Sequence, residues 1–320
     1  MESDKSPFGG IHQLFTDTTL FVKLLAVCIL MGISYLITAF LGLLLAMPLF
    51  SFNWDRLQNL IEGGMSDMGL PLLYYLQGLQ TFGLFILPAV LANRLIFNKE
   101  ENIFIPRHTG ITIAISGFLI LLTLMFSAPL LQWIIQWNAE IRLPEYMEGI
   151  ESTLQTLEQE RLEVTGRLME NKSVFIFFIN ILIISVLPAL GEEFFFRGIL
   201  QKIIVGWVRN IHLGIFIAAV CFSAFHIQFY GFFPRLLLGL FFGYLYFWSN
   251  NIWIPVLAHF LNNTLAISLS FFAEDFNIRF NDYIGELNNN SVIAGIISLA
   301  ITTGLIYLIR RKLNRPIKIN

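Results

Sequence analysis

Charged residues are scarce in this sequence: Asp, Glu, Lys and Arg make up 13% of the 320 residues, against about 25% in a typical soluble domain. Cysteine is scarcer still. Its two copies, Cys28 and Cys221, lie inside apolar stretches, which argues against a disulfide framework and suggests small core side chains. The Lys and Arg residues are scattered, so no basic nucleic-acid-binding domain is expected. We also expect no cleavable signal peptide, because the first apolar run is too long and lacks a small-residue cleavage site.

Apolar residues dominate instead, at 56% of the chain, with 32 phenylalanines and a mean hydropathy of +0.70. A membrane span needs about 20 predominantly apolar residues. The sequence therefore predicts an all-α fold, a polytopic transmembrane helical bundle of about eight spans. They are expected near residues 20–50, 70–97, 111–136, 173–196, 212–229, 232–249, 251–272 and 292–309.

The distribution of basic residues predicts the orientation, since cytoplasmic loops are rich in Lys and Arg. The chain after the last span carries Arg310, Arg311, Lys312, Arg315 and Lys318. An even number of spans then puts both termini in the cytoplasm, at the plasma (inner) membrane if the source is a prokaryote. The second and fourth connections would also be cytoplasmic, with Arg94, Lys99, Arg107, Lys202 and Arg209. The first and seventh are mainly acidic, with Asp55, Glu62, Asp67, Glu274, Asp275, Asp282 and Glu286 against Arg56 and Arg279.

The third connection, roughly residues 137–172, is unusually long and acidic. Apolar residues recur in it near helical spacing, at Ile150, Leu154, Leu157 and Leu162. This pattern predicts an amphipathic helix outside the bundle core on the non-cytoplasmic side. A solvated helical linker explains it well, and a lid over a substrate entrance has no support in the sequence.

Two carboxylates and an arginine stand at the end of the fourth expected span, in the stretch GEEFFFRGIL. Ionisable groups inside a span are costly unless paired, so they are functional candidates. Glu193 and Arg197 are four residues apart and can form an ion pair on one helical face. Glu192 lies about 100° away around the helix and can face another partner.

Two histidines and an amide come from the later expected spans. His226 lies in the fifth, with Phe222 four residues earlier on the same helical face. His259 lies in the seventh, with Asn263 four residues later. Each feature alone has an ordinary structural explanation: a salt bridge, a hydrogen-bonded core histidine, a contact between helices. Together they offer a carboxylate, two imidazoles and an amide that could activate a water and stabilise an oxyanion.

These residues form three ordered motifs: EExxxR (Glu192, Glu193, Arg197), FxxxH (Phe222, His226) and HxxxN (His259, Asn263). In this order they resemble the CPBP family, the CAAX proteases and bacteriocin-processing intramembrane proteases, which includes the type II CAAX prenyl endopeptidases. The resemblance covers about residues 190–265. It suggests a catalytic helical core at 173–272, between N-terminal spans at 1–172 and a last span with its basic tail at 273–320.

The resemblance implies an intramembrane endopeptidase acting on a membrane-attached peptide or lipidated protein, of which a prenylated CAAX-type substrate is one form. Glu192 with His226 would activate the water. Glu193 and Arg197 would support the site, and His259 with Asn263 would stabilise the oxyanion. Membrane lipid is an expected partner and nucleic acid is not, while the sequence leaves the oligomeric state open.

The cofactor and two competing functions stay open at this point. We favour a metal-free, glutamate-activated water, because the HExxH pattern of common zinc proteases is absent. Zinc held by Glu192, His226 and His259 is the alternative. A proton-coupled transporter would use the same groups to line a path, although the paired, broken helices of many transporters are not evident. A non-catalytic scaffold or immunity protein could keep the motifs for structure alone.

Overall fold

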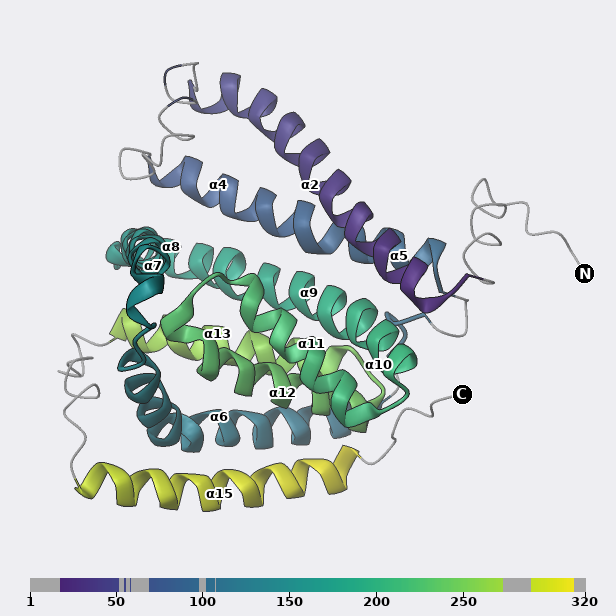
Figure 1. Ribbon diagram of the computed structural model, residues 1–320, viewed down its shortest axis with the longest axis vertical. Coiled ribbons are helices and arrows are strands. Elements are labelled where there is room, and N and C mark those ends of the chain that lie inside the picture. Colours follow the sequence, from purple (N-terminus) through teal and green to yellow (C-terminus); the bar gives the residue numbers. More distant parts are fainter. Residues whose placement is uncertain are drawn as a thin grey trace, which may run out of the picture. The chain divides into compact units, whose positions relative to one another are not determined.

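The computed structural model describes residues 18–51, 69–97, 102–106, 108–272 and 289–313, together with Asp55 and Gln58. In these ranges the regular structure is helical, with no strand (Figure 1). Seven of the helical stretches described are long and apolar enough to cross a membrane. The predicted polytopic helical bundle is confirmed. The seven stretches are Leu20–Phe50, Leu70–Leu95, Gly110–Ala139, Val174–Val208, Phe229–Ser249, Trp253–Phe272 and Val292–Leu313.

Two expected spans differ from the prediction. The fifth is the apolar helix α11 (Ile211–Phe225) of 15 residues, which at 1.5 Å per residue is about 22 Å long. That is shorter than the hydrocarbon core of a bilayer, about 30 Å. The fourth is longer than predicted, because the helical stretch continues to Val208. Lys202, which we assigned to a connection, therefore begins a helical segment, α10 (Lys202–Val208).

Part of the charge pattern used for the orientation falls outside the described residues. This is true of Arg56, Glu62, Asp67, Lys99, Arg107, Arg315 and Lys318, and of the charged residues of the seventh connection, Glu274, Asp275, Arg279, Asp282 and Glu286. Arg310, Arg311 and Lys312 are described, in the last turn of α15 (Asn289–Leu313).

The helices group into two compact units, each built from separate stretches of the chain. The first contains the described residues up to Pro106 and the stretch Leu182–Ala218. The second contains residues 108–181 and the described residues from Ala219 onward. Both the long fourth stretch and α11 contribute residues to each unit. The proposed division of the sequence at 172 and 272 stays a prediction.

In the first unit, α2 (Leu20–Phe50) packs against the stretch formed by α4 (Leu70–Thr81), the π-helical η2 (Phe82–Ile86) and α5 (Leu87–Leu95). The buried residues of α2 are small or β-branched: Val27, Ser34, Thr38, Gly42 and Ala46. The last four recur at intervals of four and form one stripe along the helix. Small residues let helix backbones approach closely, which is how helices associate within lipid.

The two partners in this pair run antiparallel (Figure 1). The Tyr75 hydroxyl donates to the carbonyl oxygen of Gly42 over 2.8 Å. Further along, Gly83 lies against Thr38, so closely that a Cβ on Gly83 would collide with the Thr38 hydroxyl. Many residues off the stripe are exposed. Cys28 is one of them, and our expectation that it is a core side chain was wrong. Neither cysteine forms a disulfide.

The second unit contains α6 (Gly110–Ala139), α7 (Glu148–Glu170), α8 (Val174–Asn180), the end of α11 from Ala219, α12 (Phe232–Ser249), α13 (Trp253–Phe272) and α15, with short η segments. Figure 1 shows α15 beside α6. Side chains from four helices form its apolar core: Ile120, Leu124, Phe242, Leu245, Ile254, Ala258, Ile309 and Leu313. The outer faces are also apolar, as lipid-facing surfaces require: Phe118 and Phe175 are among the exposed side chains.

The long third connection is helical, as predicted. It contains η4 (Glu145–Met147) and then α7. Three of the four apolar residues named in the prediction are exposed, Ile150, Leu157 and Leu162, the last at 62%, while Leu154 is half-buried. Leu168 is the buried apolar residue of α7, and the contacting side also carries Glu151 and Glu158, which hydrogen-bond to Tyr230.

A tight hairpin joins α10 to α11 in the first unit. Arg209 takes a left-handed conformation with φ of 51°. The Asn210 side chain then accepts a hydrogen bond from the Leu213 N–H over 3.1 Å, which caps the start of α11. Gly214 faces Val205 so closely that an added Cβ would lie 2.8 Å from the Val205 Cα. Because a backbone atom cannot move aside as a side-chain tip can, this position requires glycine.

Gly214→Ala is expected to destabilise the protein by about 1–3 kcal/mol, the usual cost of overpacking. The measurement is the thermal unfolding midpoint of the purified protein in detergent. Gly304→Ala in α15 is the matched control, because a Cβ there meets nothing within 4 Å. Alanine also favours helix over glycine. Equal midpoints for the two variants would contradict this account of the hairpin.

Candidate active site

The two carboxylates and the arginine lie inside a continuous helical stretch. This stretch runs through α8, the π-helical η5 (Ile181–Val186), α9 (Leu187–Glu193), the π-helical η6 (Phe194–Gln201) and α10. The helix does not end near residue 196, where we had predicted the end of the fourth span, but continues to Val208, more than two turns beyond Arg197. The position of the charges relative to the end of the membrane-crossing part stays a prediction.

Glu193 and Arg197 form the ion pair that their spacing predicts. The Arg197 Nη1 donates to the Glu193 Oε1 over 2.9 Å, and the two residues are 1% and 0% exposed. Glu192, the preceding residue, is also buried, at 8% exposure. A charge this deep is tolerated only when it is paired, and the Glu193 carboxylate is the partner of the Arg197 guanidinium.

The neighbours of these charges in the first unit are aromatic. The ring of Phe85 meets Phe195 edge-on at 5.9 Å and Phe196 in a tilted arrangement at 5.8 Å between centroids. Phe104 contacts Phe194 edge-on at 4.9 Å. Gly191 completes the packing: a Cβ there would lie 3.0–3.2 Å from side-chain atoms of Phe85, Ile86 and Thr81. The carboxylates therefore lie beside surroundings that screen charge poorly, where polar interactions are strong.

The two histidines share an aromatic neighbour in the second unit. Phe222 meets His226 edge-on at 5.3 Å between ring centroids and meets His259 in the same manner at 6.1 Å. The second ring beside His259 is Phe242 of α12, which stacks on the imidazole at 5.2 Å between centroids and an interplanar angle of 20°. The predicted contact between Phe222 and His226 is confirmed. Phe242 was missed, because nothing in the run of apolar residues around it marks one as a histidine partner.

We had predicted that His226 lies inside a helix. It is instead the first residue after α11. Its N–H donates to the Ser223 carbonyl oxygen over 3.3 Å, and the next residue, Ile227, has a φ of 52°. A left-handed conformation is a rare one for a β-branched residue. The helix therefore ends abruptly at the histidine and presents it on a turn.

Asn263 lies one helical turn after His259 on α13, as the spacing predicts. Its side-chain oxygen accepts a hydrogen bond from the Asn262 amide over 3.1 Å. This bond uses the acceptor end of the Asn263 amide, whereas an oxyanion needs the donor end. The contact thus orients the side chain without using the group that the predicted role requires.

The structure brings the predicted residues together as two sets. Glu192, Glu193 and Arg197 belong to the first unit; His226, His259 and Asn263 belong to the second. In the described parts of the chain, no group of three or more His, Cys, Asp or Glu side chains is arranged to hold a metal ion. Whether the chemistry is metal-free stays a prediction.

The fold and the two sets of residues define a class of protein. It is a polytopic helical membrane protein with buried carboxylates and two imidazoles that contact one phenylalanine ring. Residues 174–265 match the family described as type II CAAX prenyl endopeptidase Rce1-like. This segment holds all three motifs, and the resemblance to the CPBP intramembrane proteases is confirmed. The match also supports a peptidase of the CAAX type in general and, with the seven apolar helices, an integral membrane protein.

One curated relative shares sequence with this chain, but its name states no function. The uncharacterized protein YpbD of Bacillus subtilis is 29% identical over 86 residues, which are 26% of this chain and 41% of that protein. The chain thus matches less than half the length of this relative. No solved structure matches the chain.

Removal of Arg197 alone is expected to destabilise the protein by about 3–5 kcal/mol, because it leaves a buried carboxylate uncompensated. The variants are Arg197→Met and the double variant Glu193→Leu with Arg197→Met, compared by thermal unfolding in detergent. The double variant removes both charges, so it should recover much of the loss. If Arg197→Met unfolds at the wild-type temperature, the pair does not carry this structural role.

Proposed function

We propose that the chain is an intramembrane endopeptidase that hydrolyses a peptide bond of a membrane-attached substrate. The main support is the family match over residues 174–265, which contains every residue of the proposed chemistry. The buried Glu192 and the pair of imidazoles around Phe222 supply the necessary groups.

In the proposed reaction, Glu192 with His226 takes a proton from water as its oxygen attacks the scissile carbonyl carbon. A C–O bond forms and the carbonyl oxygen becomes an oxyanion, which His259 and the Asn263 amide stabilise by hydrogen bonds. The C–N bond then breaks, and the proton taken from water passes to the leaving amine. Glu193 holds Arg197, and this pair fixes the helix that carries Glu192.

The substrate class follows from the same family. We propose a peptide or protein held at the membrane by lipid or by its own apolar segment, with a prenylated CAAX-type C-terminus as one candidate. Glu192 and His259 are buried, and His259 lies between the rings of Phe222 and Phe242, so a substrate that partitions into the bilayer is favoured over a soluble peptide.

Peptidase activity of the purified protein on a quenched fluorescent prenylated peptide is the decisive test. Glu192→Gln keeps the size of the side chain but loses the base, so kcat is expected to fall by about 10²–10⁴-fold. Asn263→Ala removes one oxyanion donor and should cost about 10²–10³-fold. Glu163→Gln, on the exposed side of α7, is the control and should cleave like the wild type.

Each assay is run with and without a strong chelator. Cleavage that survives chelation supports the metal-free mechanism, whereas loss that zinc restores favours Glu192, His226 and His259 as ligands. Equal activity of Glu192→Gln and wild type would refute the proposed base. If the wild type cleaves no lipidated peptide, the transporter and scaffold functions become the better explanations.

We further propose that both termini are cytoplasmic. The basic last turn of α15 supports this for the C-terminus. For the N-terminus the proposal requires the short α11 to count as a crossing. Reporter fusions that are active only in the cytoplasm should therefore be active at both ends. Activity at the C-terminus alone would mean that α11 enters and leaves on one side, with seven true crossings.

A further inference from the structure

The turn after His226 is held by side chains from outside it. This turn comprises Ile227, Gln228 and the 3-10 helix η7 (Phe229–Gly231), after which α12 begins. The left-handed φ of Ile227 is unfavourable for a β-branched side chain. Such a conformation persists only where the surroundings determine it, so the contacts of the turn matter for His226.

The last residues of α6 supply the first of these contacts. The Asn138 side chain, fully buried, donates to the Phe229 carbonyl oxygen over 3.1 Å and accepts from the Phe233 N–H over 3.0 Å. The Ser223 hydroxyl donates to the Phe232 carbonyl oxygen over 2.6 Å. The first residue of η7 and the two residues that follow η7 are thus fixed by side chains of the same unit.

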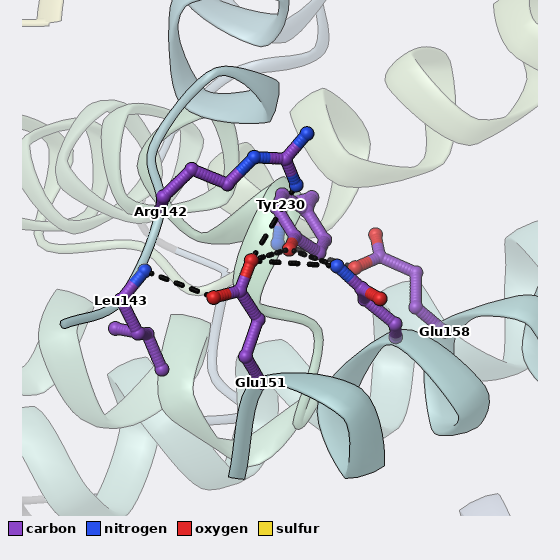
Figure 2. Close-up of polar contacts among 6 residues, drawn as sticks. Arg142, Leu143, Glu151, Glu158 and Tyr230 are labelled. Atoms are coloured by element: carbon purple, nitrogen blue, oxygen red, sulfur yellow. Dashed lines mark hydrogen bonds and ion pairs between the residues drawn. The ribbon is translucent and has the colours of Figure 1, made fainter. Parts of the chain in front are cut away.

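Helix α7 contacts the same turn through Tyr230 (Figure 2). The Glu158 Oε2 accepts from the Tyr230 N–H over 3.2 Å, and the Tyr230 hydroxyl donates to the Glu151 Oε1 over 3.1 Å. The Gln155 side-chain amide donates to the Tyr230 hydroxyl over 2.9 Å. Residues 151, 155 and 158 are spaced by four and three, so they share one helical face.

Glu151 is itself fixed at the start of α7. Its Oε2 accepts from the Leu143 N–H over 3.1 Å, and its Oε1 lies 3.4 Å from the Arg142 Nη1 (Figure 2). The ion pair is largely exposed on the arginine side and contributes little energy alone. Its importance is geometric: the carboxylate joins the connection after α6, α7 and the Tyr230 ring in one network.

We propose that α7 is a positioning element for His226. It acts through Glu151 and Glu158, which hold Tyr230, and Tyr230 lies four residues after His226 in the chain. The proposal rests on the catalytic role of His226 proposed above. The two glutamates do not touch the reacting groups. They limit the conformations of the turn, and therefore the direction in which the His226 ring points.

Three variants test this network. Tyr230→Phe removes only the hydroxyl, and Glu158→Ala removes the acceptor for the Tyr230 N–H. Glu158→Gln keeps an acceptor oxygen and should behave as the wild type. Glu160→Ala, the same change at an exposed acid of α7, is the matched control. Tyr230→Phe and Glu158→Ala are expected to lower kcat by up to about 10²-fold, with KM unchanged, as for a misplaced catalytic group.

Two readouts do not depend on activity. The first is hydrogen exchange of the peptide that contains residues 226–233, and the second is the rate at which diethyl pyrocarbonate modifies His226, both followed by mass spectrometry. Both should rise several-fold in Tyr230→Phe and Glu158→Ala, and both should stay at the wild-type level in Glu158→Gln and Glu160→Ala.

The outcomes separate this proposal from the proposed function. If the wild type cleaves no substrate, the peptidase assignment fails, while exchange and modification still decide whether α7 controls the His226 turn. Unchanged exchange and modification in Glu158→Ala and Tyr230→Phe would overturn the proposal, even if kcat falls. A rise in both with an unchanged kcat would also overturn it, because the turn would then not govern catalysis.

Discussion

A single constraint, the burial of Arg197 beside Glu193 within one helix, shapes much of this protein. A guanidinium that is 1% exposed inside an apolar helix cannot be left uncompensated, and the Glu193 carboxylate, one turn earlier, lies 2.9 Å from it. The helix around it must stay continuous and well packed, because water would otherwise reach the charges. The close fit of Gly191 against Thr81, Phe85 and Ile86 serves that requirement.

The second unit holds its two imidazoles in different ways, one within a helix and one on a turn. His259 sits within α13 between two phenylalanine rings, whereas His226 stands on a turn with a strained following residue. A turn offers the ring a direction that a helical position would not allow. It also needs support, which here comes from the buried Asn138 and from the polar face of α7.

Patterns of residues predicted the helical fold and the local pairs, because both depend on short-range spacing. The i,i+4 rule gave the contact of Glu193 with Arg197 and that of Phe222 with His226. Hydropathy could not reveal that α11 is only 15 residues long, since the apolar run continues past the end of the helix. Nor could it show that α7 packs with Glu151 and Glu158, because helical periodicity marks an apolar face and this contact is polar. The roles predicted for the six candidate catalytic residues stay predictions, because spacing places side chains and does not show what they react with.

The π-helical segments have a consequence for how relatives of this chain are aligned. In η6, which contains Arg197, the hydrogen-bonded turn is one residue wider than an α-turn, so it accommodates one extra residue without breaking the helix. Loss of a single residue there would restore a regular α-helix and, because the wide turn had absorbed the extra residue, would leave the residues beyond it on nearly the same face. A one-residue gap in this part of an alignment is therefore compatible with an unchanged fold. Relatives without the extra residue would still present the same side of the helix after the motif.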